Sequence, residues 1–176
     1  MSAIYRLLII SLSTAILAVL SQLTIPIGIT PITLQTFAVG LIASLLKWKE
    51  ALLAVILYIL LGALGLPVFS GGTSGIATLV SPNSGFIWGF LLFALVTSLL
   101  PKTNILSLFL ANVFGDLCIF VCGLLSLHYL GQLSWEASFL AGFLPFIPVE
   151  LIKILLISII VPRLRQSLKT ITYFQS

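Results

Sequence analysis

Charged residues are scarce in this chain. Only 7% of its 176 residues are charged, against about 25% in an ordinary soluble domain, and 60% are hydrophobic. This balance excludes a soluble globular protein and indicates an integral membrane protein that crosses the lipid bilayer several times. Almost every residue is needed inside the bilayer, so no length remains for a soluble catalytic domain. We expect a single transmembrane domain over residues 1–170.

Motifs of known chemistry are absent as well. The sequence contains no Walker motif, no H-E-x-x-H, no Gly-x-Ser-x-Gly and no Cys/His cluster with ligand spacing, so we expect no enzyme activity, no cofactor and no metal. Cys118, Cys122 and the one histidine, His128, are explained by packing and by a position at the membrane interface. The eight basic residues are scattered and form no nucleic-acid patch. ATP hydrolysis, if needed, must come from another chain.

Apolar runs predict six membrane crossings and an all-α fold. A spanning helix needs about 20 residues, and fewer if it is short and untilted. The first run is too long for a signal peptide and has no clear cleavage site, so it counts as a helix. Residues 171–176 resemble the end of a protease-cleavage tag and are set apart as a tail. The six expected helices are 5–23, 33–46, 51–64, 86–100, 104–130 and 134–162.

The basic residues predict the orientation in the membrane. With both termini cytoplasmic, the external loops contain no lysine or arginine, as the positive-inside rule favours. The basic residues then found at the cytoplasmic side are Arg6, Lys47, Lys49, Lys102, Arg163, Arg165 and Lys169. Lys153 is the one that lies within a crossing. The same assignment places loops 24–33 and 66–85 together on the outer face.

Glu150 and Lys153 are the closest pair of opposite charges inside a predicted crossing. A charged residue at mid-membrane depth costs about 2.5–3.5 kcal/mol, so it normally faces a protein interior. The two lie three residues apart, on one face of a helix. Pro145 and Pro148 loosen the turn before them. Either the pair is structural, or Lys153 receives an anionic ligand group while Glu150 orients it.

The two outer loops supply further candidates for a binding site. In loop 66–85, glycines allow a close backbone approach to a ligand. Asn83 either stabilises its turn or offers a donor and an acceptor to a polar ring. Four aromatic side chains either pack in the bundle or wall an apolar slot, and these are Phe69, Phe86, Trp88 and Tyr58.

Three more polar residues lie within or beside the predicted crossings. Asp116 is a lone acid in helix 104–130, suited to a satisfied internal contact, to proton or ion coupling, or to a ligand. Thr33 and Gln35 stand at the outer start of helix 33–46, where they can cap the helix or bind. All three are candidate substrate-binding residues.

Four short sequences resemble the BioY family, the biotin-specific substrate-binding (S) components of energy-coupling-factor transporters. They follow the expected order over most of the chain, and the second is the most specific. They are PITLQT at 31–36, LLGALGLPVFSGG at 60–72, SPNSGF at 81–86 with Gly89 and Phe90, and PVELIK at 148–153.

This resemblance implies a six-helix S-component fold with a vitamin site near the outer face, covered by the first and third loops. By analogy, Glu150 and Lys153 form part of the biotin site, and Asn83 contacts the ligand. The implied partners are biotin, a transmembrane coupling protein, two ATPase subunits and the lipid bilayer.

We therefore expect a biotin uptake subunit in a bacterial inner membrane. Two rival functions remain at this point. One is an S component for another small vitamin. The other is a proton-coupled carrier or intramembrane enzyme that uses Asp116, Glu150 and Lys153.

Overall fold

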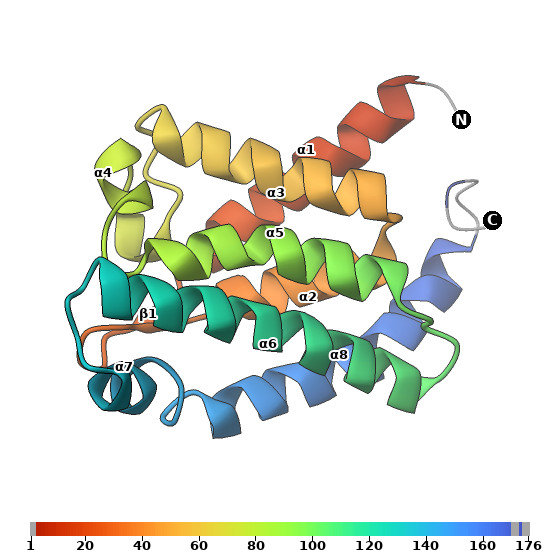
Figure 1. Ribbon diagram of the computed structural model, residues 1–176. Coiled ribbons are helices and arrows are strands. Elements are labelled where there is room, and N and C mark those ends of the chain that lie inside the picture. The colour runs from red at the N-terminus through yellow and green to blue at the C-terminus, as the bar shows by residue number, and fades with distance from the viewer. Residues whose placement is uncertain (1–2, 170–172, 174–176) are drawn as a thin grey trace.

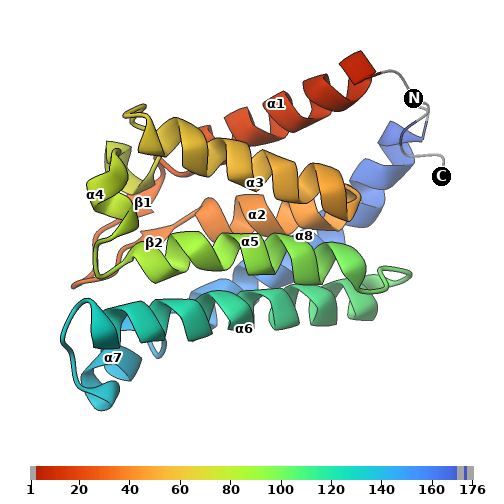
Figure 2. The same cartoon turned by 45° about the horizontal axis from the view of Figure 1, so that its top comes forward.

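The computed structural model describes residues 3–169 and residue 173, and most of them are helical. The longer helices run alongside one another as a bundle (Figures 1 and 2): α1 (Ala3–Leu20), α2 (Gln35–Leu45), α3 (Trp48–Ala63), α5 (Ser84–Leu99), α6 (Ile105–Tyr129) and α8 (Ile147–Leu168). The short elements are β1 (Thr24–Ile25), β2 (Ile32–Thr33), η1 (Ser70–Gly72), α4 (Ile76–Leu79) and α7 (Trp135–Gly142). The structure is mostly helical, as predicted, but β1 and β2 pair as a short antiparallel sheet that the all-α prediction did not include.

The bundle has two different ends. The start of α1 and the end of α8 lie together at one end, which we call the terminal end (Figure 1). The short elements β1, β2, α4 and α7 gather at the other, the loop end. The predicted grouping of loops 24–33 and 66–85 on one side of the molecule agrees with this arrangement.

Judged by length and composition alone, some of the helices are able to cross a membrane. α1 and α6 are long and apolar enough, and α7 with α8 would make a third crossing if the bent pair counts as one. α2 and α5 are apolar but shorter, with 11 and 16 residues. A helix rises 1.5 Å per residue. A helix shorter than the bilayer core can still form part of a crossing when the residues that flank it cover the remaining distance to the interface.

The predicted helix 134–162 is wrong in two respects. It is broken at residues 143–146, and α7 and α8 meet there at 45°. Pro148 lies in the first turn of α8, where its missing N–H removes no helical hydrogen bond, so it helps to start the helix. Pro162 does not end α8, which continues to Leu168. The break turns the start of α8 toward the middle of the bundle.

Two predicted helix starts are confirmed by their hydrogen bonds. The Asn104 side chain accepts from the Ser107 N–H at 2.8 Å, and the Ser107 hydroxyl accepts from the Asn104 N–H at 3.0 Å, which forms a capping box. Ser134 caps α7 by accepting from the Ala137 N–H at 3.1 Å. These caps fix where α6 and α7 begin.

Glycines allow α5, α6 and α2 to pack closely beneath the loops. A Cβ atom on Gly89 would lie 2.8 Å from the Ile119 Cα of α6. A Cβ atom on Gly40 of α2 would lie 2.7 Å from both Asn112 and Ile157. Gly89 meets backbone, so a larger residue does not fit there, whereas at Gly40 the neighbouring side chains would have to shift. The middle of the bundle is therefore filled by helix packing.

Basic side chains close the helices at the terminal end. Lys102, in the loop between α5 and α6, donates to the carbonyl oxygens of Ala43 and Ser98, both at 3.1 Å. Arg165 donates to the carbonyls of Lys102 and Ser44 at 2.8 and 2.7 Å. These bonds satisfy carbonyl groups that a helix end leaves open. Burial, and then the charge of Arg165, lower the pKa of Lys102 to about 8.

Candidate ligand-binding site

A cavity of about 470 Å³ lies among the elements of the loop end. Its walls come from the segment 30–36, the segment 69–90, α6 near Asp116 and Phe120, and the start of α8. Small-molecule sites in proteins have volumes of about 300–1,000 Å³. The cavity therefore has the size of a small organic ligand.

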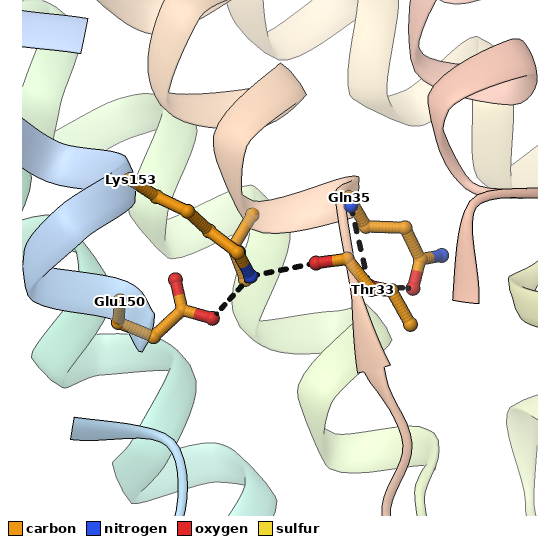
Figure 3. Close-up of polar contacts among 5 residues, drawn as sticks. Thr33, Gln35, Glu150 and Lys153 are labelled. Carbon is orange, nitrogen blue, oxygen red and sulfur yellow. Dashed lines mark hydrogen bonds and ion pairs between the residues drawn. The ribbon is translucent and has the colours of Figure 1, made fainter. Parts of the chain in front are cut away.

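Glu150 reaches this cavity from the first turn of α8. That turn follows the break between α7 and α8, and Glu150 within it is 5% exposed. A carboxylate is favoured in a first turn, because the free N–H groups there carry partial positive charge. The side chain is held by Lys153, whose Nζ donates to Glu150 Oε1 at 2.6 Å (Figure 3).

Lys153 is not among the residues that line the cavity, although Glu150, which it contacts, is. Besides Glu150, its Nζ donates to the Thr33 carbonyl at 2.6 Å and to the Thr36 hydroxyl at 3.0 Å. An ammonium group has three donors, so all three are used. Lys153 joins α8 to the start of α2 and can contact an anionic ligand only by releasing one of these bonds.

Thr33 and Gln35 continue the polar wall on the other side of Lys153, as Figure 3 shows. The Thr33 hydroxyl donates to Gln35 Oε1 at 3.0 Å and accepts from the Gln35 N–H at 3.2 Å. Both residues line the cavity. Tyr58 does not, because it is fully buried behind Gln35, whose Nε2 donates to the Tyr58 hydroxyl at 2.6 Å. Tyr58 supports the wall from outside the cavity.

Asn83 lines the cavity and also ties the two outer loops together. Its Oδ1 accepts from the Thr30 hydroxyl and its Nδ2 donates to the Ile29 carbonyl, both at 2.9 Å. The sequence left two roles open for Asn83, which were turn stabilisation and ligand contact. The structure shows a contact between loops, which leaves one amide hydrogen and one lone pair of Asn83 for a ligand.

The predicted aromatic slot is only partly present. Phe69 and Phe86 line the cavity. Phe69 is held over Gly62 of α3, where an added methyl group would overlap its ring, and it meets the Tyr58 ring edge to face at 5.5 Å. Trp88 lies outside the cavity lining, is 45% exposed and donates its indole N–H to the Leu79 carbonyl at 3.1 Å.

Asp116 faces the same cavity from α6, with 5% of its surface exposed. Its Oδ1 is buried and has no hydrogen-bond partner. Asp116 and Glu150 also line a smaller hollow of about 130 Å³ between α6 and α8. Leaving a buried carboxyl oxygen without a hydrogen bond costs free energy. The oxygen therefore indicates a side chain whose hydrogen bonding is completed by a group from outside the protein.

Several residues of the cavity were missed in the sequence. Phe90, Phe120 and Phe146 line it, each four residues from a predicted site residue on the same helix or helix entry. That spacing places residues on one helix face and would have found them. Hydroxyl groups form the remaining rim, and they come from Thr30, Ser70, Thr73, Thr78 and Ser81. No sequence signal distinguishes them from ordinary loop residues.

Within the described part of the chain, no three His, Cys, Asp or Glu side chains gather in a way that could hold a metal ion. His128 stacks on Trp135, with ring centroids 4.0 Å apart, and its Nδ1 lies 2.7 Å from the Leu133 carbonyl. Cys118 and Cys122 are free thiols. These groups take no part in the cavity.

Comparison with known proteins places the chain in a family. The model of the BioY family matches residues 1–170. Biotin transporter BioY2 of Lactococcus lactis is 46% identical, over 89% of this chain and 87% of that protein. Biotin transporter BioY of Thermotoga maritima is 39% identical, over 87% of this chain and 91% of that protein.

A solved structure has the same fold. It is the S-component for biotin from an ECF-type ABC transporter, and it superposes with a TM-score of 0.87 at 27% identity. The match covers 94% of this chain and 95% of the other.

Proposed function

The chain belongs to the BioY family, and from this premise we propose that it is the biotin-binding and uptake subunit of an energy-coupling-factor transporter. Membership places it among transporter subunits and not among enzymes. The motif search in the sequence points the same way, since the chain has no site for ATP hydrolysis.

The observation that carries the proposal is the cavity with acceptor groups at its base and apolar walls. Biotin has an apolar body, a ureido ring with two N–H donors, and a carboxylate. Glu150 offers a carboxyl oxygen to N–H groups, while Phe69 and Phe86 face an apolar body. Gln35, Thr33 and Asn83 add amide and hydroxyl groups at the sides.

We assign Lys153 first as the residue that holds Glu150. Its three donors are already engaged, and it lies outside the cavity wall. The expectation that it binds an anionic ligand group requires one of those bonds to open when ligand arrives. The two roles of Lys153 can be distinguished by the affinity for a ligand whose carboxylate has been replaced by an uncharged group.

In the membrane, we propose six crossings made by α1, α2, α3, α5, α6 and the α7–α8 pair, with both termini cytoplasmic. The positive-inside pattern supports this orientation, which turns the cavity and the loop end outward. A transmembrane coupling protein and two ATPase subunits are the partners that would supply energy, in a bacterial cell membrane. Residues 171–176, set apart as a tail, lie outside the described residues except for Tyr173.

Thermal unfolding of the detergent-purified protein tests the function. A ligand that binds only the folded state stabilises it by about 2.7 kcal/mol at a hundredfold excess over Kd. Biotin is expected to raise the unfolding temperature, whereas thiamine and riboflavin at equal excess are not. If biotin produces no shift while another vitamin does, the chain is an S component for that vitamin.

A further inference from the structure

The cavity contains more carboxyl groups than cations. Among the residues that the structure describes, Asp116 and Glu150 are the ionisable side chains that line it, and Lys153 is the cation that contacts one of them. When all three are ionised, they leave one net negative charge among side chains that are almost fully buried. Asp116 and Glu150 are each 5% exposed, as is Lys153.

Lys153 compensates Glu150 and has no donor left for Asp116. Its three N–H groups go to Glu150, Thr33 and Thr36 at 2.6 to 3.0 Å. Asp116 interacts electrostatically with both charged neighbours on α8, but its Oδ1 has no hydrogen-bond donor. Of the two carboxyl groups, Asp116 is therefore the one whose charge is least compensated.

No other charged group of the described chain faces Asp116. The helices α2 and α5 contain no Asp, Glu, Lys or Arg. On α7, Glu136 lies in the first turn and outside the cavity lining. On α8, Arg163 and Arg165 lie toward the terminal end, where Arg165 binds carbonyl groups. Thus Glu150 and Lys153 are the charges that act on Asp116.

An anionic ligand makes this imbalance larger. A carboxylate that enters the cavity raises the net charge to two negatives, and like charges at close range in a poorly solvated site repel strongly. Protonating Glu150 would give up its ion pair with Lys153 at 2.6 Å. Protonating Asp116 gives up no hydrogen bond at Oδ1 and turns that oxygen into a donor.

We propose that binding of the carboxylate-bearing ligand is coupled to the uptake of one proton, which is held by Asp116. This inference rests on the proposed function, because it takes biotin as that ligand. The bound state holds more protons than the free state, so affinity falls as pH rises. For one proton the decrease approaches about tenfold in affinity per pH unit, once the free protein no longer holds that proton. At lower pH the affinity becomes constant.

Isothermal titration calorimetry of the purified full chain tests the coupling. Biotin is titrated between about pH 6 and about pH 9, in buffers that differ in ionisation enthalpy, so that the buffer dependence of the heat gives the number of protons taken up. We expect this number to approach one in the upper part of the range. In Asp116→Asn it should be near zero and the affinity should vary little with pH. Biotin amide, which is neutral, should show a weaker dependence in the wild-type protein.

Infrared difference spectra supply a readout that needs no variant. Adding biotin at a pH where uptake is measured should produce a carbonyl band of a protonated carboxylic acid. Equal proton uptake in the wild type and in Asp116→Asn would overturn the proposal, and so would normal binding with no uptake at any pH. A dependence on sodium in place of pH would overturn it as well. Absence of biotin binding at every pH would instead refute the proposed function.

Discussion

Each end of the bundle has a buried glutamate paired with a basic side chain, but the other charged groups at the two ends have different hydrogen-bonding environments. At the terminal end, Arg6 binds Glu50 at 2.8 Å with a side chain that is 43% exposed. At the loop end, Lys153 binds Glu150 at 2.6 Å, and both side chains are 6% exposed. The arginine of the first pair is largely exposed, whereas both members of the second pair are almost fully buried.

The charges outside these pairs differ more. Lys102 and Arg165 at the terminal end donate to helix carbonyls, so each of these charges has hydrogen-bond partners within the protein. Asp116 at the loop end leaves an oxygen without a partner beside a cavity. Polar groups that are satisfied internally build the fold, whereas a polar group left open next to a cavity indicates binding.

The largest expected effect is that of Lys153→Met. It leaves Glu150 buried without its partner, and breaking a buried pair in this way costs about 3–5 kcal/mol. Thermal unfolding measures the loss. The double variant Glu150→Gln, Lys153→Met should recover a large part of it. Biotin and biotin amide should lose affinity equally if Lys153 only positions Glu150. A selective loss for biotin would show that Lys153 receives the carboxylate.

Asn83→Ala should have the next largest effect, on binding more than on stability. It removes two hydrogen bonds between the outer loops, each worth about 0.5–1.5 kcal/mol. We expect biotin to dissociate about ten times faster or more, measured by stopped-flow fluorescence. Ser98→Ala is the control, because it removes one side-chain hydrogen bond, to the Leu95 carbonyl at 3.0 Å, away from the cavity and should leave dissociation nearly unchanged.

Lys102 predicts a pH dependence of stability at the terminal end. Its pKa is about 8 when folded and 10.5 when unfolded, so between these values the unfolded chain binds more protons. Stability should therefore rise with pH in this window, by about 1 kcal/mol because part of the side chain reaches water. Thermal unfolding of Lys102→Met should lack this rise. An identical slope in both proteins would show that Lys102 is not responsible.

The smallest effect is expected for Arg6→Gln. The partly exposed pair with Glu50 should contribute no more than about 1 kcal/mol. Biotin affinity should not change, because the pair lies at the end of the bundle opposite the cavity. A loss of binding comparable to that of the loop-end variants would remove the distinction between the two ends.

The fold could be predicted from sequence to the extent that it depends on local signals. Apolar runs located the long helices within a few residues, and Asn104 and Ser134 marked two helix starts correctly. The break at 143–146 was missed because the apolar run continues through it. Pro162 was misread because a proline within a helix can be tolerated when neighbouring groups adjust.

The candidate site was predicted in part for a similar reason. Polar residues such as Glu150 and Asp116 stand out against an apolar background, so the sequence alone selects them. Whether an aromatic residue reaches the cavity depends on tertiary packing: Trp88 lies outside the lining, and Tyr58 is buried behind Gln35. The order of Lys153 behind Glu150 depends on where Thr33 and Thr36 meet α8, and this contact spans more than a hundred residues.

The glycine packing below the cavity has a consequence for transport kinetics. At Gly40 a Cβ atom would meet side-chain atoms of Asn112 and Ile157 at 2.7 Å, so α2 packs closely against α6 and α8 at that level. The cavity lies among the elements of the loop end, so we expect a ligand to enter and leave the isolated chain between the loops. Reconstituted alone in vesicles, it should bind biotin without accumulating it inside. We expect net transfer to depend on the energising partner subunits proposed above.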